Sequence, residues 1–248
     1  MTNANQPPTP GRTGTLTVLA AMEAEIRPLV RSLALTPARV GGRRAWTGTV
    51  QGAPVLVATI GVGSANAAGS TARILDAIEV SRVLVAGVSG AVDPALSIAD
   101  VVVPGAVIDR MSGRSYRPTA PPDTQPSGTL LTCTGLVTGA EEATNLHAGG
   151  ISLVDMETAA VAAVCERNDC RWSVYRAISD RLADELLDAS MIELLRPDGT
   201  IDRAGALRLV ARRPSHMRRL VRLGIDTRAA IAALTRRVRD DVHRSVSG

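Results

Sequence analysis

The feature that most constrains the fold of this chain is the segment spanning residues 153–180. It opens with an apolar run at 151–154, continues with an alanine-rich stretch at 158–165, and ends with strand-forming residues at 173–179. These parts predict a strand, a helix and a second strand. Such a crossover is expected to place two parallel strands side by side, and open α/β sheets bind ligands outside the carboxyl ends of their strands.

Three carboxylates follow the ends of these two predicted strands: Asp155, Glu157 and Asp180. Gathered at one sheet edge they repel one another unless sugar hydroxyls, a transferable proton or a metal needs them. They are therefore candidates for a ligand site. The alternative is structural, with Glu157 a favourable acid in the first turn of a helix and Asp180 the cap of the next one.

The rest of the 248-residue chain mostly alternates strand and helix patterns. Strands are predicted at 15–21, 44–50, 54–60, 82–87, 99–108 and 130–138, helices from 22 onwards and at 67–78, and a long surface loop at 109–127. This order predicts an α/β fold of three layers, a mixed sheet flanked by helices. Two turns carry small residues suited to a close ligand approach, Gly61 with Gly63 and Ser89 with Gly90.

The expected organisation is a disordered leader at 1–14, one domain at 15–195 and a helical C-terminal extension at 196–248. The leader is rich in Asn, Gln, Pro and Thr, so it resembles neither a signal peptide nor a membrane span. The three cysteines have no metal-ligand spacing, which indicates a reduced cytoplasmic compartment and predicts no metal and no cofactor.

Five motifs in register resemble the purine nucleoside phosphorylase and methylthioadenosine/S-adenosylhomocysteine nucleosidase superfamily. They are LAAMEAEI at 19–26, IGVG at 60–63, AGVSG at 86–90 with IADVVV at 98–103, VDMET at 154–158 and RAISD at 176–180. The resemblance covers roughly residues 15–190. Within the superfamily, VSGAVDPAL at 88–96, LRPDGTI at 195–201 and the stretch 207–214 look most like the hopanoid-associated phosphorylases, which are thought to remove adenine from adenosylhopane.

The resemblance implies cleavage of the N-glycosidic bond of a purine nucleoside. It makes Asp180 the general acid that protonates the purine at N7, with Ser179 beside it and Arg176 shaping the pocket. Glu157 is implied to bind ribose hydroxyls, where a carboxylate also favours a cationic transition state. Met156 is implied to lie against the sugar, although a gap-filling core methionine fits the pattern nearly as well. Asp155 and the two glycine-containing turns complete the predicted binding site.

Glu25 bears on the choice between two reactions. In the hydrolytic branch of the family, a glutamate at this position orients and deprotonates the attacking water. A phosphorolytic enzyme would place a phosphate dianion against that carboxylate, which opposes it electrostatically. Arg27 lies two residues along the helix and therefore on another face. We favour hydrolysis, and phosphate-dependent cleavage stays the alternative.

The sequence departs from the nucleosidase pattern near the expected base pocket. A hydrophobic purine contact is missing after the strand predicted at 130–138, where Glu141 and Glu142 stand, and Val88 replaces the usual hydroxyl. The segment between Gly139 and Ile151 is also short. These changes leave the base and the 5′ substituent open.

The net charge of +4 belongs to the tail, because twelve of the 28 basic residues lie between 203 and 244, all of them arginines. Apolar residues recur through 217–238 at helical steps, so an amphipathic helix is expected to begin near Pro214. It is expected to pack on the core or a second subunit, or to contact an anionic membrane peripherally. Binding to nucleic acid, on an inactive scaffold, is disfavoured because stacking aromatic residues are scarce. The resemblance implies a homo-oligomer.

Overall fold

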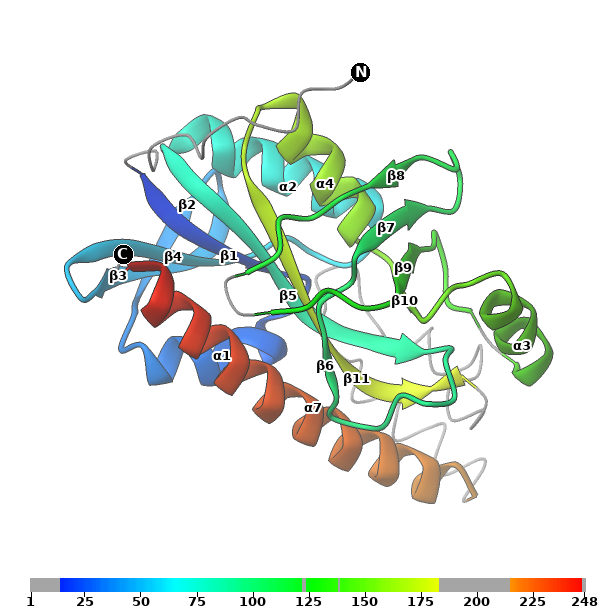
Figure 1. The fold of residues 1–248 in the computed structure, drawn as a ribbon. Coiled ribbons are helices and arrows are strands. Elements are labelled where there is room, and N and C mark those ends of the chain that lie inside the picture. The colour runs from blue at the N-terminus through cyan, green and yellow to red at the C-terminus, as the bar shows by residue number, and fades with distance from the viewer. Residues whose placement is uncertain (1–13, 122–123, 138, 183–214, 247–248) are drawn as a thin grey trace.

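One mixed β-sheet runs through the molecule, and helices cover both of its faces (Figure 1). The computed structural model describes residues 14–121, 124–137, 139–182 and 215–246. Helices α2 and α4 pack on one face and α1 and α7 on the other, each pair in its own buried apolar cluster with the strands. This is the predicted three-layer α/β arrangement.

The elements follow one another in an order that mostly alternates strands with helices. They are β1 (Thr15–Ala20), α1 (Glu23–Ser32), β2 (Thr36–Val40), β3 (Arg43–Val50), β4 (Ala53–Thr59), α2 (Ser64–Ala77), β5 (Val80–Ala91), β6 (Val101–Val102), β7 (Ala106–Asp109), β8 (Ser115–Tyr116), β9 (Thr129–Thr132), α3 (Ala140–Ala148), β10 (Leu153–Asp155), α4 (Thr158–Arg167), β11 (Trp172–Arg181) and α7 (Ser215–Val246). The strand order is β2-β3-β4-β1-β5-β10-β9-β7-β8, and β11 pairs with β5 and with β6.

Strand β5 is the centre of the sheet because three other strands pair with it. It runs parallel to β1 and to β11, and its last residues pair in the antiparallel sense with β10. Apart from Arg82, its side chains are apolar or small and mostly buried, as expected for a strand covered on both faces. The end of β5 is thus the point where β10 and β11 approach each other.

The prediction that the strands of the 153–180 unit lie side by side and parallel is wrong. β10 is antiparallel to β5 whereas β11 is parallel to it, so α4 carries the chain across β5 from one strand to the other. The reason is the length of β5, which spans 12 residues and extends past β1. One edge of its end accepts β10 while β11 occupies the other edge.

Several element boundaries also differ from the sequence predictions. The strand expected at 99–108 is two strands, because Pro104 and Gly105 interrupt it and its halves pair with β11 and with β9. The loop expected at 109–127 contains β8, which forms a hairpin with β7. The strand expected at 130–138 ends at Thr132, and both β2 and α3 were missed.

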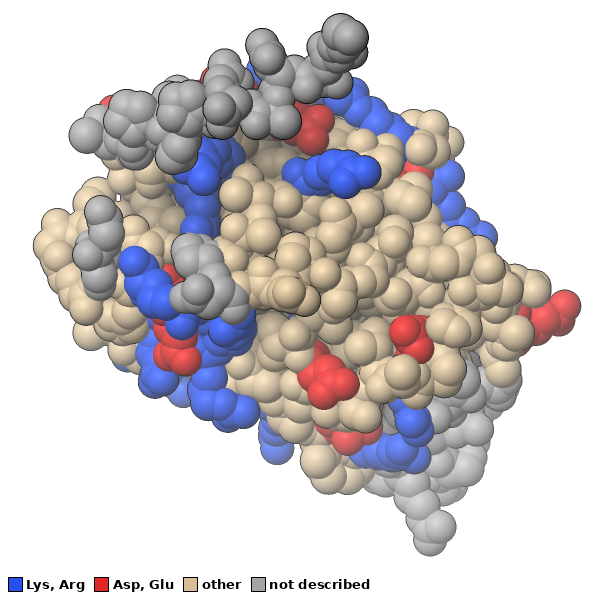
Figure 2. Space-filling view, in the orientation of Figure 1, with Lys and Arg blue, Asp and Glu red and all other residues tan. Residues whose placement is uncertain are grey.

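The C-terminal basic segment contributes the long helix α7, as predicted. Its side chains at Ala230, Leu234, Val238 and Val242 are buried in one cluster with α1 and the sheet. The amphipathic stripe therefore packs on the core from Ala230 onwards, as the first of the expected alternatives requires. Arginines line the outer side, and Figure 2 shows blue atoms gathered over this part of the molecule.

The described part of α7 is also anchored by charge. Asp241 is fully buried and forms an ion pair with Arg82 of β5, and Arg237 lies over the ring of Tyr175 of β11, 5.8 Å from its centroid. None of the described helices is both long enough and apolar enough to span a bilayer. The proposed boundaries at 14 and 195 fall at or inside the undescribed ranges.

We predict that Leu234→Ala lowers the free energy of unfolding by about 2–5 kcal/mol, because it leaves a cavity between α7 and the sheet. Urea denaturation measures the change. Ile225→Ala on the same helix is the matched control, since its side chain is 60% exposed, and it should stay within about 0.5 kcal/mol of the parent. Equal effects from both substitutions would show that α7 does not pack on the sheet in solution.

Candidate functional site

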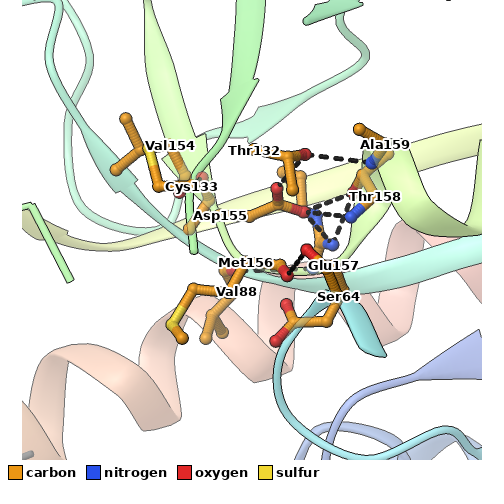
Figure 3. Close-up of polar contacts among 12 residues, drawn as sticks. Ser64, Val88, Thr132, Cys133, Val154, Asp155, Met156, Glu157, Thr158 and Ala159 are labelled. Carbon is orange, nitrogen blue, oxygen red and sulfur yellow. Dashed lines mark hydrogen bonds and ion pairs between the residues drawn. The ribbon is translucent and has the colours of Figure 1, made fainter. Parts of the chain in front are cut away.

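Polar side chains from four elements meet beside Gly87 of β5, near the last residue of β10 and the middle of β11. Figure 3 shows Asp155, Glu157 and Thr158 of this group. Glu25 comes from the first turn of α1, Asp155 from the last residue of β10, Glu157 from the start of α4 and Arg176 from β11. All four side chains are nearly inaccessible to solvent. Charged groups are seldom buried together unless they are paired or needed for function, so this cluster is the candidate site.

Glu25 is held by backbone donors at both of its oxygens. Its Oε2 accepts the N–H of Met22 at 2.8 Å and its Oε1 accepts the N–H of Val88 at 2.9 Å. Burial raises the pKa of this carboxyl above its ordinary value, and the nearby guanidinium of Arg176 opposes that rise. Glu25 is therefore a fixed carboxylate with an increased affinity for a proton.

Glu157 connects α4 to the glycine turn that precedes α2. Its Oε1 accepts the N–H of Gly63 at 2.8 Å, and the adjacent Ser64 hydroxyl donates to the carbonyl of Met156 at 3.0 Å. Gly63 has a φ of 85°, which a residue with a side chain rarely adopts. Burial, and next the charge of Asp155, raise the pKa of Glu157 to about 7.

Asp155 is committed to neighbouring protein groups. Its Oδ1 accepts a hydrogen bond from the Thr132 hydroxyl at 2.6 Å, and its Oδ2 accepts from both the N–H of Thr158, at 3.0 Å, and the Thr158 hydroxyl (Figure 3). Oδ2 also accepts from the guanidinium of Arg176. The prediction that Asp155 binds substrate therefore finds no support in its contacts. Its oxygens hold other side chains in place.

Asp180 and Ser179 form a second group at the end of β11. The Ser179 hydroxyl donates to Asp180 Oδ1 at 2.6 Å, and it also lies 3.4 Å from the carbonyl oxygen of Ser89. Gly90 of β5 faces this pair, since a Cβ placed on it would stand 3.2 Å from Asp180 Oδ2. Asp180 thus lies near the end of β11, beside β5, and is buried.

The remaining predicted residues lie around these groups in different ways. Ser89 donates to the carbonyl of Val154 at 2.7 Å and so connects β5 to β10. Gly61 donates its N–H to the carbonyl of Ala21 and adopts a φ of 84°, which shapes the turn. Arg27 is paired with Glu23 and largely exposed, on a different face from Glu25 as predicted.

The expected lack of a hydrophobic purine contact after residues 130–138 stays a prediction, but the strand that precedes this region is shorter than expected. Because β9 ends at Thr132, Val137 lies beyond it, and it is buried in one cluster with Cys133, Val154 and Leu182. Both acids lie on α3, where Glu141 is exposed and the half-buried Glu142 pairs with Arg110. The apolar wall near Asp180 is therefore aliphatic. Within the described ranges, no three His, Cys, Asp or Glu residues are grouped as a metal site.

Gly87 is a site residue that the sequence analysis missed. A Cβ on it would stand 2.2 Å from Nη1 of Arg176 and 2.8 Å from Oε1 of Glu25, so these two side chains meet over its Cα. A glycine inside a buried central strand is the signal that could have identified it, because such a residue often marks a close approach of other groups. Thr132 and Thr158 were also missed, and neither carries a distinctive pattern.

We predict that Gly87→Ala lowers the free energy of unfolding by roughly 1–3 kcal/mol, because the methyl group overpacks two buried side chains. Thermal or urea unfolding measures the loss. Gly135→Ala is the matched control, since a Cβ at Gly135 meets no atom within 4 Å, and it should be neutral. A Gly87→Ala protein as stable as the parent would contradict the packing of Glu25 and Arg176 described above.

Comparison with known proteins agrees with this fold. The sequence pattern of the Phosphorylase superfamily matches residues 15–144 and 121–197. A 5′-methylthioadenosine/S-adenosylhomocysteine nucleosidase of Lysinibacillus sphaericus is 29% identical over 196 residues, which cover 66% of this chain and 85% of that protein. The nucleosidase of the same name from Anoxybacillus flavithermus is 27% identical over 196 residues, covering 66% and 84% respectively.

Solved structures share the architecture at low sequence identity. The futalosine hydrolase of Helicobacter pylori superposes with a TM-score of 0.72 at 17% identity, covering 94% of this chain and 98% of that one. The 5′-methylthioadenosine/S-adenosylhomocysteine nucleosidase of the same organism, complexed with a pyrrolidinol compound, gives a TM-score of 0.70 at 17% identity, covering 94% and 99%. The chain therefore belongs to the Phosphorylase superfamily.

Proposed function

We propose that this protein hydrolyses the N-glycosidic bond of an adenine nucleoside and releases the free base. The observation that carries the proposal is the buried carboxylate of Glu25, fixed by two backbone N–H groups beside Glu157 and Arg176. The two relatives reported above are named as nucleosidases that act on adenine nucleosides, which supports the same reaction class.

In the proposed reaction, a water molecule attacks the anomeric carbon of the ribose while the bond from that carbon to the purine nitrogen breaks. Glu25 accepts a proton from the water, and protonated Asp180 delivers one to the leaving purine. Glu157 accepts hydrogen bonds from the ribose hydroxyls and stabilises the positive charge that develops on the sugar. Ser179 orients the Asp180 carboxyl through its hydrogen bond to Oδ1.

The arrangement of charges favours water over phosphate as the nucleophile. The carboxylate of Glu25 already occupies the N–H groups of Met22 and Val88, which are the kind of donors that an anion would use. A phosphate dianion beside Glu25 would also face Asp155 and Glu157, and Arg176 is already paired with Asp155. Phosphorolysis therefore remains the less favoured alternative.

We predict that the protein releases adenine from an adenine nucleoside in phosphate-free buffer, and that Glu25→Gln lowers kcat by about 10²–10⁴-fold because an amide cannot accept the proton. The substrates are adenosine, methylthioadenosine, S-adenosylhomocysteine and adenosylhopane, and the free adenine released from each is measured by chromatography. Glu23→Gln is the control, since Glu23 is paired on the helix surface with Arg27 and Arg44. A strict requirement for phosphate would refute hydrolysis.

We further predict that Asp180→Asn retains binding of adenine but loses about 10²–10⁴-fold in kcat, because the amide keeps the shape of the side chain and cannot supply a proton. Calorimetric titration with adenine and the same release assay separate the two effects. Asp76→Asn, on the exposed side of α2, provides the control for loss of a carboxylate. Normal turnover by Asp180→Asn would remove Asp180 from the mechanism.

The group at the ribose 5′ position is the finer part of the proposal. Adenosylhopane stays a prediction from the sequence, and its inclusion in the substrate panel tests it directly. The predicted membrane contact has a smaller apolar surface available, because the stripe of α7 packs on the core from Ala230 onwards. Of the apolar side chains before that point, Val221 and Ile225 are exposed. Homo-oligomerisation likewise stays a prediction.

A further inference from the structure

Arg176 has two carboxylates within reach and is paired with one of them. Its Nη2 donates to Asp155 and, at 2.6 Å, to the hydroxyl of Thr158, while Nη1 lies 3.4 Å from the carbonyl oxygen of Val88. Among the described residues, Arg176 forms its ion pair with Asp155. Its Nη1 and Oε1 of Glu25 nevertheless both lie over the Cα of Gly87. The guanidinium thus stands next to Glu25 without closing on it.

This geometry needs an explanation, because a buried guanidinium and a buried carboxylate attract each other strongly. Charge-assisted hydrogen bonds are among the strongest in proteins, and burial of both groups strengthens their attraction. Asp155 competes with Glu25 for this guanidinium and forms the ion pair because its own carboxylate is fixed. Thr132 donates to one of its oxygens, and Thr158 donates to the other through both its N–H and its hydroxyl. Thr158 also accepts from Arg176, so a single hydroxyl touches both partners of the ion pair.

We propose that Asp155 is a positioning residue which, with Thr158, holds the guanidinium of Arg176 back from Glu25 and so keeps the Glu25 carboxylate open to its ligand. The inference rests on the proposed function and deepens it, since the ligand in question is the nucleophilic water. If Glu25 formed an ion pair with Arg176, the guanidinium would occupy its oxygens, and Glu25 would be a weaker base than the unpaired carboxylate.

The electrostatic consequence has a definite sign. The charged groups that face Glu25 are Arg176, Asp155 and Glu157, and of these only Arg176 lowers the pKa of the Glu25 carboxyl. If Arg176 moves onto Glu25, that pKa falls. Because the proposed base must be ionised, the acidic limb of the rate profile then moves to lower pH while the maximal rate decreases.

Thr158→Val and Thr158→Ser form the discriminating pair. Valine removes the hydroxyl that touches both Asp155 and Arg176 without changing any charge, whereas serine keeps it. We expect Thr158→Val to lower kcat by up to about 10²-fold, with a smaller change in KM, and to move the acidic limb of kcat/KM to lower pH. Thr158→Ser should recover both the rate and the pH profile. A loss of rate with an unmoved acidic limb, or no rescue by serine, would overturn the proposal.

Crystal structures of the parent and of Thr158→Val give a readout that does not require turnover. We expect Arg176 to form an ion pair with Glu25 at about 3 Å in the variant and not in the parent. Asp155→Asn should show the same movement of Arg176 onto Glu25, and this variant replaces Thr158→Val in the experiment if Thr158→Val does not fold. An Arg176 that keeps its position in the variant overturns the proposal, whereas a parent without activity on any nucleoside refutes only the proposed function.

Discussion

The buried ion pair between Asp155 and Arg176 is the interaction on which the arrangement of the site depends. It joins β10 to β11, two strands on opposite edges of β5 that do not pair with each other. A buried pair depends on further hydrogen bonds to its remaining polar atoms. Thr132 and Thr158 donate to the carboxylate of Asp155, whereas Nε of Arg176 is buried without a hydrogen-bond partner among the described residues. Through Thr158, the first residue of α4, the same network sets the start of the helix that follows Glu157.

The site concentrates negative charge that folding alone would avoid. Glu25, Asp155 and Glu157 are buried around one guanidinium, and burial raises the pKa of both glutamates. For Glu157 the folded-state pKa lies near 7, above its unfolded value. The stability contributed by its protonated form is therefore complete in acid and lost as the pH rises through that value. The free-energy cost of burying several carboxylates together is typical of a functional site, where their charge acts on a substrate.

The end of the chain completes the fold on the face opposite α2 and α4. Helix α7 buries four aliphatic side chains against α1 and the sheet, and its Asp241 pairs with Arg82 inside the protein. Tyr175 faces this helix while its neighbour Arg176 contributes to the site, because successive side chains of β11 point to opposite faces. The packing of α7 thus supports the strand that carries Arg176, Ser179 and Asp180.

The amino-acid sequence alone determined the α/β class, most of the strands and helices, and the acids of the site, because hydrophobic periodicity and the placement of carboxylates after strands are local properties. Only the tertiary structure decided which residues meet. The long-range pairing of β5 put β10 and β11 on opposite edges, where Asp155 of one strand forms an ion pair with Arg176 of the other. Gly87 acquires its role for the same reason: the side chains that cross its Cα come from α1 and β11, distant in sequence and adjacent only after folding. From the sequence, the amphipathic stripe of α7 could pack on the core or a second subunit or could contact a membrane; in the structure it packs on an apolar face of the sheet.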